Sequence, residues 1–104
     1  MAMFTGLRLP HIFGKVFAQS GSYQLWEHET NLFAMVRHQP SADLRIWLDV
    51  GMLEWPWLLE SNRRMHSLLR ERGYDVSYRE FVAGHCFTAW RNSMWRGLET
   101  LLAP

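Results

Sequence analysis

Cysteine is nearly absent from this sequence, which has one, Cys86, among its 104 residues. A single cysteine excludes an internal disulfide and a cysteine-rich metal site. It also fits a reducing compartment, so we expect a cytoplasmic protein. The five histidines show no His-x-x-x-His spacing. We therefore expect no bound metal, and nothing in the sequence calls for another cofactor.

Long apolar runs and an excess of one charge are also missing. No apolar stretch approaches the ~18 residues of a membrane-spanning helix, and the first residues lack the basic and apolar segments of a signal peptide. The chain has 11 basic and 10 acidic residues, a net charge of +1. Such a balance does not favour binding to a polyanion. We expect neither a membrane nor a nucleic acid as a partner.

The composition that remains is typical of a globular protein. Hydrophobic residues make up 48% of the chain and charged residues 20%. Six tryptophans provide large apolar side chains for a core or for a ligand groove. The length predicts a single domain over residues 1–104.

Hydrophobic periodicity predicts helices and strands in alternation. The predicted strands are 14–19, 44–50 and 75–82, and the predicted helices are 1–9, 30–38, a helix from Pro56 to the capping Gly73, and 87–102. Residues 23–28 are expected to be irregular. Alternation of this kind is typical of an α/β fold with about three parallel strands and right-handed crossovers.

One stretch, VAGHCFTAWR at 82–91, places a Gly-His turn between the last strand and the last helix. Together with RIWLDVG at 45–51, Glu54, NRR at 62–64 and GYDV at 73–76, it resembles the C-terminal part of the enterochelin-esterase-like family of α/β-hydrolases. FGKV at 13–16 and QSGS at 19–22 resemble the family's strand after the nucleophile helix. The resemblance covers nearly the whole chain. It implies a partial α/β-hydrolase fold, the C-terminal half of a doubly wound sheet.

The resemblance also implies two catalytic residues. His85 follows the last strand, where α/β-hydrolases place the histidine that moves the proton. The orienting acid follows the penultimate strand, and Glu54 lies in that loop, whereas the alternative acid, Asp49, lies inside the strand. Cys86 stands where the family commonly has an acidic residue, which leaves the local support of His85 open.

The nucleophile is not visible in the sequence. Hydrolases of this fold carry the serine in Gly-x-Ser-x-Gly, and no such motif occurs here. The resemblance places that turn just before the helix 1–9, so we expect this chain to be inactive alone. Ser20 and Ser22 follow a strand, where active-site residues gather, and we expect them to line the substrate site with Trp26.

The other tryptophans have two explanations. Trp47, Trp55 and Trp57, with Trp26, are candidates for an aromatic wall around a catechol-like group, but core packing explains them equally well. For Trp90 we expect packing, and for Arg91 surface charge.

Two functions fit these observations. The first is a segment of a serine carboxylic-ester hydrolase that acts on a small-molecule ester. The alternative is a small non-catalytic α/β module that binds a protein partner or forms a homo-oligomer through an exposed sheet edge.

Overall fold

The structure is a computed structural model that describes residues 2–25, 28–29 and 31–104. Its main sheet has three parallel strands in the order β1-β4-β5. A two-stranded antiparallel ribbon, β2-β3, lies apart from it. The elements in chain order are α1 (Ala2–Arg8), β1 (Lys15–Gln19), β2 (Gln24–Leu25), β3 (His28–Glu29), α2 (Asn31–His38), β4 (Arg45–Gly51), α3 (Pro56–Glu71), β5 (Asp75–Phe81) and α4 (Phe87–Leu102).

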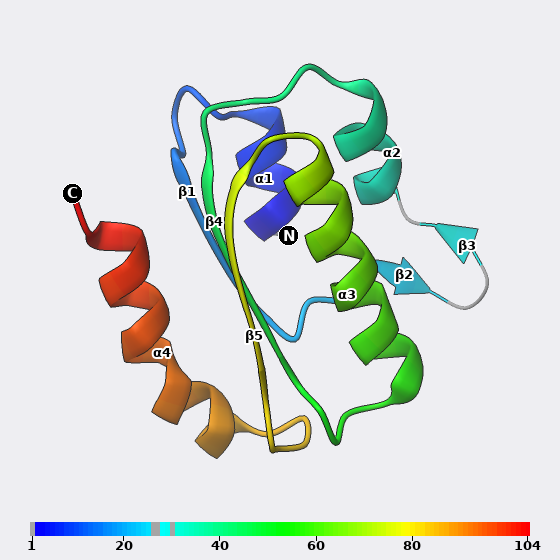
Figure 1. Ribbon diagram of the computed structural model, residues 1–104, viewed down its shortest axis with the longest axis vertical. Helices are drawn as coiled ribbons and strands as arrows, with labels where there is room; N and C mark the ends of the chain where they lie inside the picture. Colours follow the sequence, from blue (N-terminus) through cyan, green and yellow to red (C-terminus); the bar gives the residue numbers. More distant parts are fainter. Residues whose placement is uncertain (1, 26–27, 30) are drawn as a thin grey trace.

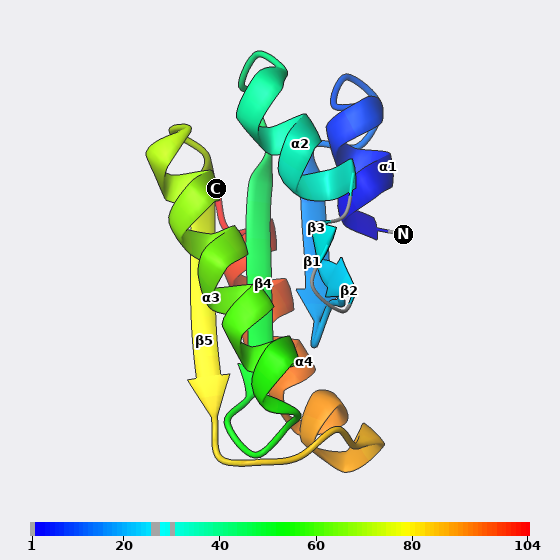
Figure 2. The same ribbon diagram turned by 90° about the vertical axis from the view of Figure 1, so that its right-hand side faces the viewer.

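The helices cover both faces of the sheet. Figures 1 and 2 show α4 on one face, while α1, α2 and α3 lie on the other. The three strand arrows point the same way, towards the loops that lead into α3 and α4 (Figure 2). The predicted alternation of helices with three parallel strands is therefore confirmed. The carboxyl ends of the strands lie at one edge, where ligand sites of such sheets form.

The central strand, β4, explains why the two faces differ. Ile46, Leu48 and Val50 alternate along it and are fully buried. Ile46 and Leu48 belong to the apolar core beneath α1, α2 and α3. Trp47 and Asp49 alternate with them and are buried as well. A strand with helices on both sides is buried on both faces, so its sequence need not alternate between apolar and polar residues.

Helix α3 begins and ends where its sequence predicts. Pro56 is in its first turn, and Gly73 follows its last turn with a φ of +84°, a conformation that glycine adopts without steric cost. Its buried residues include Leu58, Met65 and Leu69, which share one face.

The expectation of irregular structure over 23–28 is wrong in part, because β2 begins at Gln24 and pairs with β3. Each of these strands has two residues, too few to show the alternation by which strands are recognised. None of the helices in the described ranges has the length and apolarity needed to cross a membrane.

Helix α4 approaches the sheet closely at Gly97. Ser93, Gly97 and Leu101 form its buried face. A Cβ atom on Gly97 would collide with the ring of Phe17 on β1. The absence of a side chain therefore sets the distance between α4 and the sheet.

Replacing Gly97 with Ala should destabilise the protein, although Ala ordinarily favours a helix. The propensity gain is at most about 1 kcal/mol, while overpacking costs about 1–3 kcal/mol. We expect a net loss of about 1–2 kcal/mol in the free energy of unfolding, measured by urea denaturation. Gly14→Ala is the control, because nothing lies within 4 Å of its added Cβ. A Gly97→Ala variant as stable as the parent would contradict this packing.

Candidate active site

Two loops at the carboxyl edge of the sheet are bonded to each other. The loop after β4 spans 52–55, and the loop after β5 spans 82–86. The backbone N–H of Met52 donates to the carbonyl of Phe81 at 2.7 Å, and that of Leu53 donates to the carbonyl of Ala83 at 3.1 Å. The first loop contains Glu54 and the second contains His85, so these bonds hold the two side chains in one place.

Glu54 lies in a tight turn that closes over its own carboxylate. Its backbone N–H donates to the carbonyl of Gly51 at 3.2 Å, and the N–H of Gly51 donates to Glu54 Oε2 at 2.6 Å. Gly51 has no room for a side chain, because a Cβ there would collide with the carbonyl of Ala83. The Glu54 side chain is completely buried. A buried carboxylate needs such donors to offset its lost hydration.

The structure brings Glu54 and His85 into direct contact. His85 Nδ1 lies 2.5 Å from Glu54 Oε1. The histidine side chain is 42% exposed, whereas the carboxylate beneath it is inaccessible. A carboxylate bound to Nδ1 fixes the orientation of an imidazole and its tautomer, and leaves Nε2 to exchange protons with another molecule. The arrangement is thus chemically competent for general base catalysis.

The alternative acid, Asp49, lies elsewhere. Its Oδ2 accepts hydrogen bonds from Trp47 Nε1 at 2.9 Å and from Gln19 Nε2 at 3.2 Å. In the described part of the chain no hydrogen bond joins it to His85. Burial raises the pKa of Asp49, and the bonds from Trp47 and Gln19 oppose that shift. The geometry therefore assigns the histidine's partner to Glu54 and makes Asp49 part of the interior.

Of the three residues expected to line the substrate site, one contacts the Glu54–His85 pair. Ser20 is buried, and its hydroxyl donates to Glu54 Oε2 at 2.6 Å. Ser22 is exposed, and within the described ranges no hydrogen bond connects it to Glu54 or His85. Trp26 lies outside the described residues.

Trp90 contacts both Ser20 and His85, whereas the sequence predicted only packing for it. Its indole Nε1 donates to Ser20 Oγ at 2.9 Å, and its ring meets that of His85 edge-on, with centroids 4.6 Å apart. The signal was its place in the first turn of α4, because helical side chains lean towards the N-terminus. That lean carries Trp90 over the loop that contains His85.

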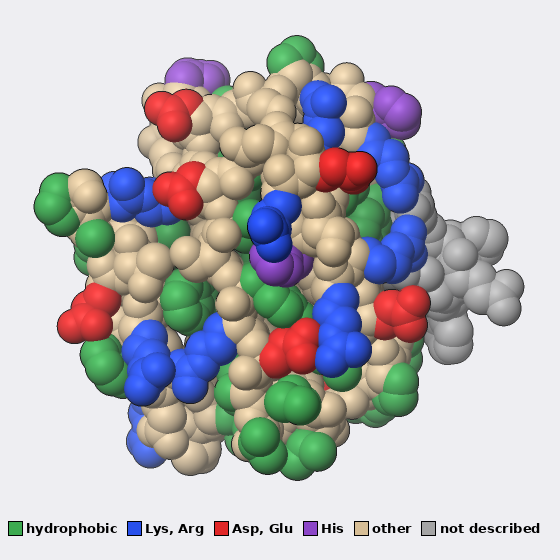
Figure 3. All heavy atoms as spheres, viewed as in Figure 1, with side chains coloured by type: hydrophobic (Ala, Val, Ile, Leu, Met, Phe, Trp, Pro, Cys, Tyr) green, Lys and Arg blue, Asp and Glu red, His purple; other side chains and the backbone are tan. Residues whose placement is uncertain are grey.

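Exposed aromatic rings flank the histidine. Trp55 and Trp57 stack with centroids 6.1 Å apart, and Trp55 lies 5.2 Å from His85. Figure 3 shows hydrophobic side chains gathered at the bottom of the molecule, over the loops after β4 and β5. The hydrophobic residues exposed in and beside these loops include Met52, Leu53, Trp55, Trp57, Val82 and Phe87. Trp47 contributes to no such wall, because it is buried beneath α4.

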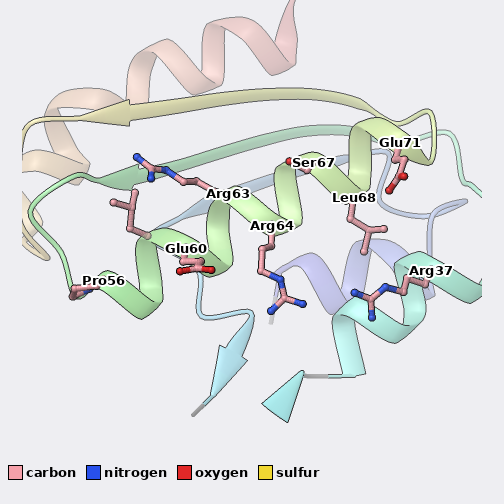
Figure 4. A pocket seen from close by; sticks show the side chains of 9 residues that line it. Arg37, Pro56, Glu60, Arg63, Arg64, Ser67, Leu68 and Glu71 are labelled. Carbon is pink, nitrogen blue, oxygen red and sulfur yellow. The ribbon is translucent and has the colours of Figure 1, made fainter. Parts of the chain in front are cut away.

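A separate hollow of about 670 Å³ lies along α3, facing α2. Figure 4 shows charged side chains of both signs around it, from Arg37 on α2 to Glu60, Arg63, Arg64 and Glu71 on α3. Neither Glu54 nor His85 lines it. In the ranges that the structure describes, no three side chains of the kinds that bind metals lie together.

A family model described as "Putative esterase" matches residues 1–101. The chain belongs to this esterase family.

The relatives of this esterase family member agree with the resemblance seen in its sequence. Iron(III) enterobactin esterase of Escherichia coli strain K12 is 32% identical over 110 residues, and that of Dickeya dadantii strain 3937 is 28% identical over 116 residues. These matches cover 99% and 97% of this chain, but 27% and 26% of the two relatives. The chain thus spans about a quarter of their length, and the prediction of an enterochelin-esterase-like family is confirmed.

Solved esterases share the fold. The enterobactin esterase FES from Shigella flexneri, solved in the presence of 2,3-di-hydroxy-N-benzoyl-serine, superposes with a TM-score of 0.85 at 31% identity. That match covers 96% of this chain and 27% of the other. A ferulic acid esterase superposes with a TM-score of 0.73 at 18% identity, over 96% of this chain and 45% of its own. The predicted α/β-hydrolase fold is confirmed.

The buried Asp49 of this member of the esterase family predicts a pH effect. Its pKa is higher in the folded than in the unfolded protein, so the folded protein binds the proton more tightly. The stabilisation from that proton is complete below the unfolded pKa of about 4 and is lost as the pH rises through the folded pKa.

As the pH rises above about 4, Asp49→Asn should therefore lose less free energy of unfolding than the parent. Urea denaturation at a series of pH values measures the difference. Asp43→Asn, which changes an exposed carboxylate, should follow the parent. Parallel pH profiles for the parent and Asp49→Asn would show that Asp49 has no raised pKa.

Proposed function

We propose that this chain supplies the acid and the base of a serine carboxylic-ester hydrolase. His85 is the general base, and Glu54 orients it. The contact of 2.5 Å between His85 Nδ1 and Glu54 Oε1 carries the proposal, because a carboxylate on that nitrogen is the arrangement that serine hydrolysis needs. The esterase family and the names of the relatives support the same reaction class.

The proposed reaction uses both nitrogens of His85. Nε2 takes the proton of a serine hydroxyl as that oxygen attacks the ester carbonyl. The resulting imidazolium, paired with Glu54, gives the proton to the alcohol oxygen as the ester bond breaks. A water molecule then repeats the sequence on the acyl-enzyme and releases the acid. Glu54 keeps the proton of the neutral ring on Nδ1, so that Nε2 is basic at each step.

We place the nucleophilic serine outside this segment. The sequence contains no Gly-x-Ser-x-Gly, and the hydroxyl of Ser20 is already bonded to Glu54 and Trp90. The chain corresponds to about a quarter of its curated relatives, which leaves most of such an enzyme to be supplied by other residues. On this proposal the 104 residues alone have no esterase activity.

The proposed substrate is a small ester that carries an aromatic group. Two observations support it: Trp55 and Trp57 stack beside His85, and a solved relative was studied with an aromatic acyl-serine. Flat apolar surfaces favour flat apolar groups, so the tryptophans give such an ester a place to rest next to the base.

Homo-oligomerisation through a sheet edge is the second candidate. Strand β1 is at the edge of the sheet, since it pairs with β4 alone among the described strands. Ile12 and Phe13, just before it, are 61% and 47% exposed. An edge strand beside exposed apolar side chains is suited to pairing with another chain. Size-exclusion chromatography of this chain at increasing concentration distinguishes a homo-oligomer from a monomer.

A hybrid enzyme tests the catalytic proposal. This chain replaces the matching segment of the Escherichia coli K12 iron(III) enterobactin esterase, and hydrolysis of a chromogenic ester and of enterobactin is followed. We expect an active hybrid whose kcat falls by about 10⁴ on Glu54→Gln, because the tautomer is no longer fixed. His85→Ala should cost about 10⁶.

Asp43→Asn, at an exposed carboxylate remote from the pair, is the control and should keep the hybrid's activity. Circular dichroism establishes that each variant is folded. A folded Glu54→Gln hybrid with undiminished kcat would refute the assignment of Glu54, and an active His85→Ala hybrid would refute the proposal as a whole.

A further inference from the structure

Ser20 has a backbone conformation that serine rarely adopts. Its φ is +51°, and it is the one described residue other than glycine with a positive φ. The position directly follows β1, and its N–H continues the ladder by donating to the carbonyl of Asp49 at 2.7 Å. A residue other than glycine in the left-handed region is strained, and such strain persists only where other contacts enforce it. Glycine would fit the backbone better, so the serine side chain is what needs explaining.

The hydroxyl of Ser20 has a fixed direction. An indole N–H can only donate, so the bond from Trp90 Nε1 at 2.9 Å occupies a lone pair of Ser20 Oγ. An ionised carboxylate can only accept, so the hydrogen of Ser20 points to Glu54 Oε2, 2.6 Å away. Trp90 itself is held by a bond from Gln19 Nε2 to its backbone carbonyl at 3.0 Å. The hydroxyl therefore acts as a directed donor.

The two oxygens of Glu54 have separate partners. Oε2 accepts from Ser20 Oγ and from the N–H of Gly51, both at 2.6 Å, and Oε1 meets His85 Nδ1. Rotating the carboxylate about its last torsion would break all three contacts. With Oε2 saturated, Oε1 is the oxygen left for the histidine. Charge-assisted bonds of this kind are the strong ones.

We propose that Ser20 is a positioning residue of the acid: through Glu54 Oε2, its hydroxyl fixes the carboxylate plane that orients His85. The inference rests on the proposed function of the Glu54–His85 pair and adds to it a third side chain, with Trp90 as the donor that directs the hydroxyl. Ser20 accordingly acts through Glu54 and forms no bond with the substrate.

Ser20→Gly is the sharpest test, because glycine fits the backbone and removes the hydroxyl together with the Cβ atom that bears it. The readout is the ¹⁵N spectrum of the His85 ring in the 104-residue chain at alkaline pH, where a histidine is ordinarily neutral. We expect the parent to hold the proton on Nδ1 and the variant to show a mixture of both tautomers. Hydrogen exchange of the Trp90 indole N–H should become about tenfold faster or more, since its acceptor is gone.

Two further variants keep the test specific. Trp90→Phe retains a ring against His85 but frees the Ser20 hydroxyl to rotate, and it should shift the tautomers in the same direction, by less. Ser61→Ala removes another fully buried hydroxyl, one that bonds to Leu58 within α3, and it should leave the His85 spectrum unchanged.

Failure of this inference is distinguishable from failure of the proposed function. If Ser20→Gly keeps the parent's tautomer and the parent's Trp90 exchange, Ser20 does not position Glu54, whatever the hybrid enzyme does. If the tautomers shift while the Glu54→Gln hybrid remains fully active, the positioning stands and the esterase role of the pair falls.

Discussion

The arrangement at the end of the sheet depends on one buried carboxylate. Glu54 has no solvent contact through its side chain, so its charge must be compensated by donors that the fold delivers. Those donors come from three places: Ser20 at the end of β1, Gly51 at the end of β4, and His85 after β5. Parallel strands in the order β1-β4-β5 bring these ends to a common edge. The contacts that compensate the charge of Glu54 thus join the carboxyl ends of all three strands of the main sheet.

The two faces of the sheet contribute differently to this edge. The face under α1, α2 and α3 is apolar and supplies the packed core. On the face under α4, Asp49 accepts hydrogen bonds from Trp47 and Gln19. Gln19 also donates to the backbone carbonyl of Trp90. Polar contacts run from the interior to the first turn of α4, which places the Trp90 ring against His85. Gly97 permits the close approach of α4 to the sheet at Phe17.

Much of the fold and of the candidate site could be predicted from the sequence. Periodicity located the three main strands, and the resemblance to the esterase family pointed to Glu54 and His85 in the loops after β4 and β5. Other features were not accessible. The hairpin β2-β3 is too short to leave a pattern, and the φ of Ser20 has no signature, because serine is common after strands for simpler reasons. The contact of Trp90 with Ser20 joins residues 70 apart in the chain. Local propensity does not encode contacts between residues so far apart in the chain, so such contacts can be identified only when the packing is known.

We propose that Ser20 positions the acid and that the nucleophile comes from outside these residues. Labelling the folded 104-residue chain with a fluorophosphonate, followed by peptide mapping, tests it most directly. We predict no adduct on Ser20 or Ser22, because the hydroxyl of Ser20 donates to Glu54 and no hydrogen bond in the described ranges joins Ser22 to His85. An adduct on Ser20 that disappears in His85→Ala would contradict the positioning role of Ser20, since it would make Ser20 a nucleophile activated by that base.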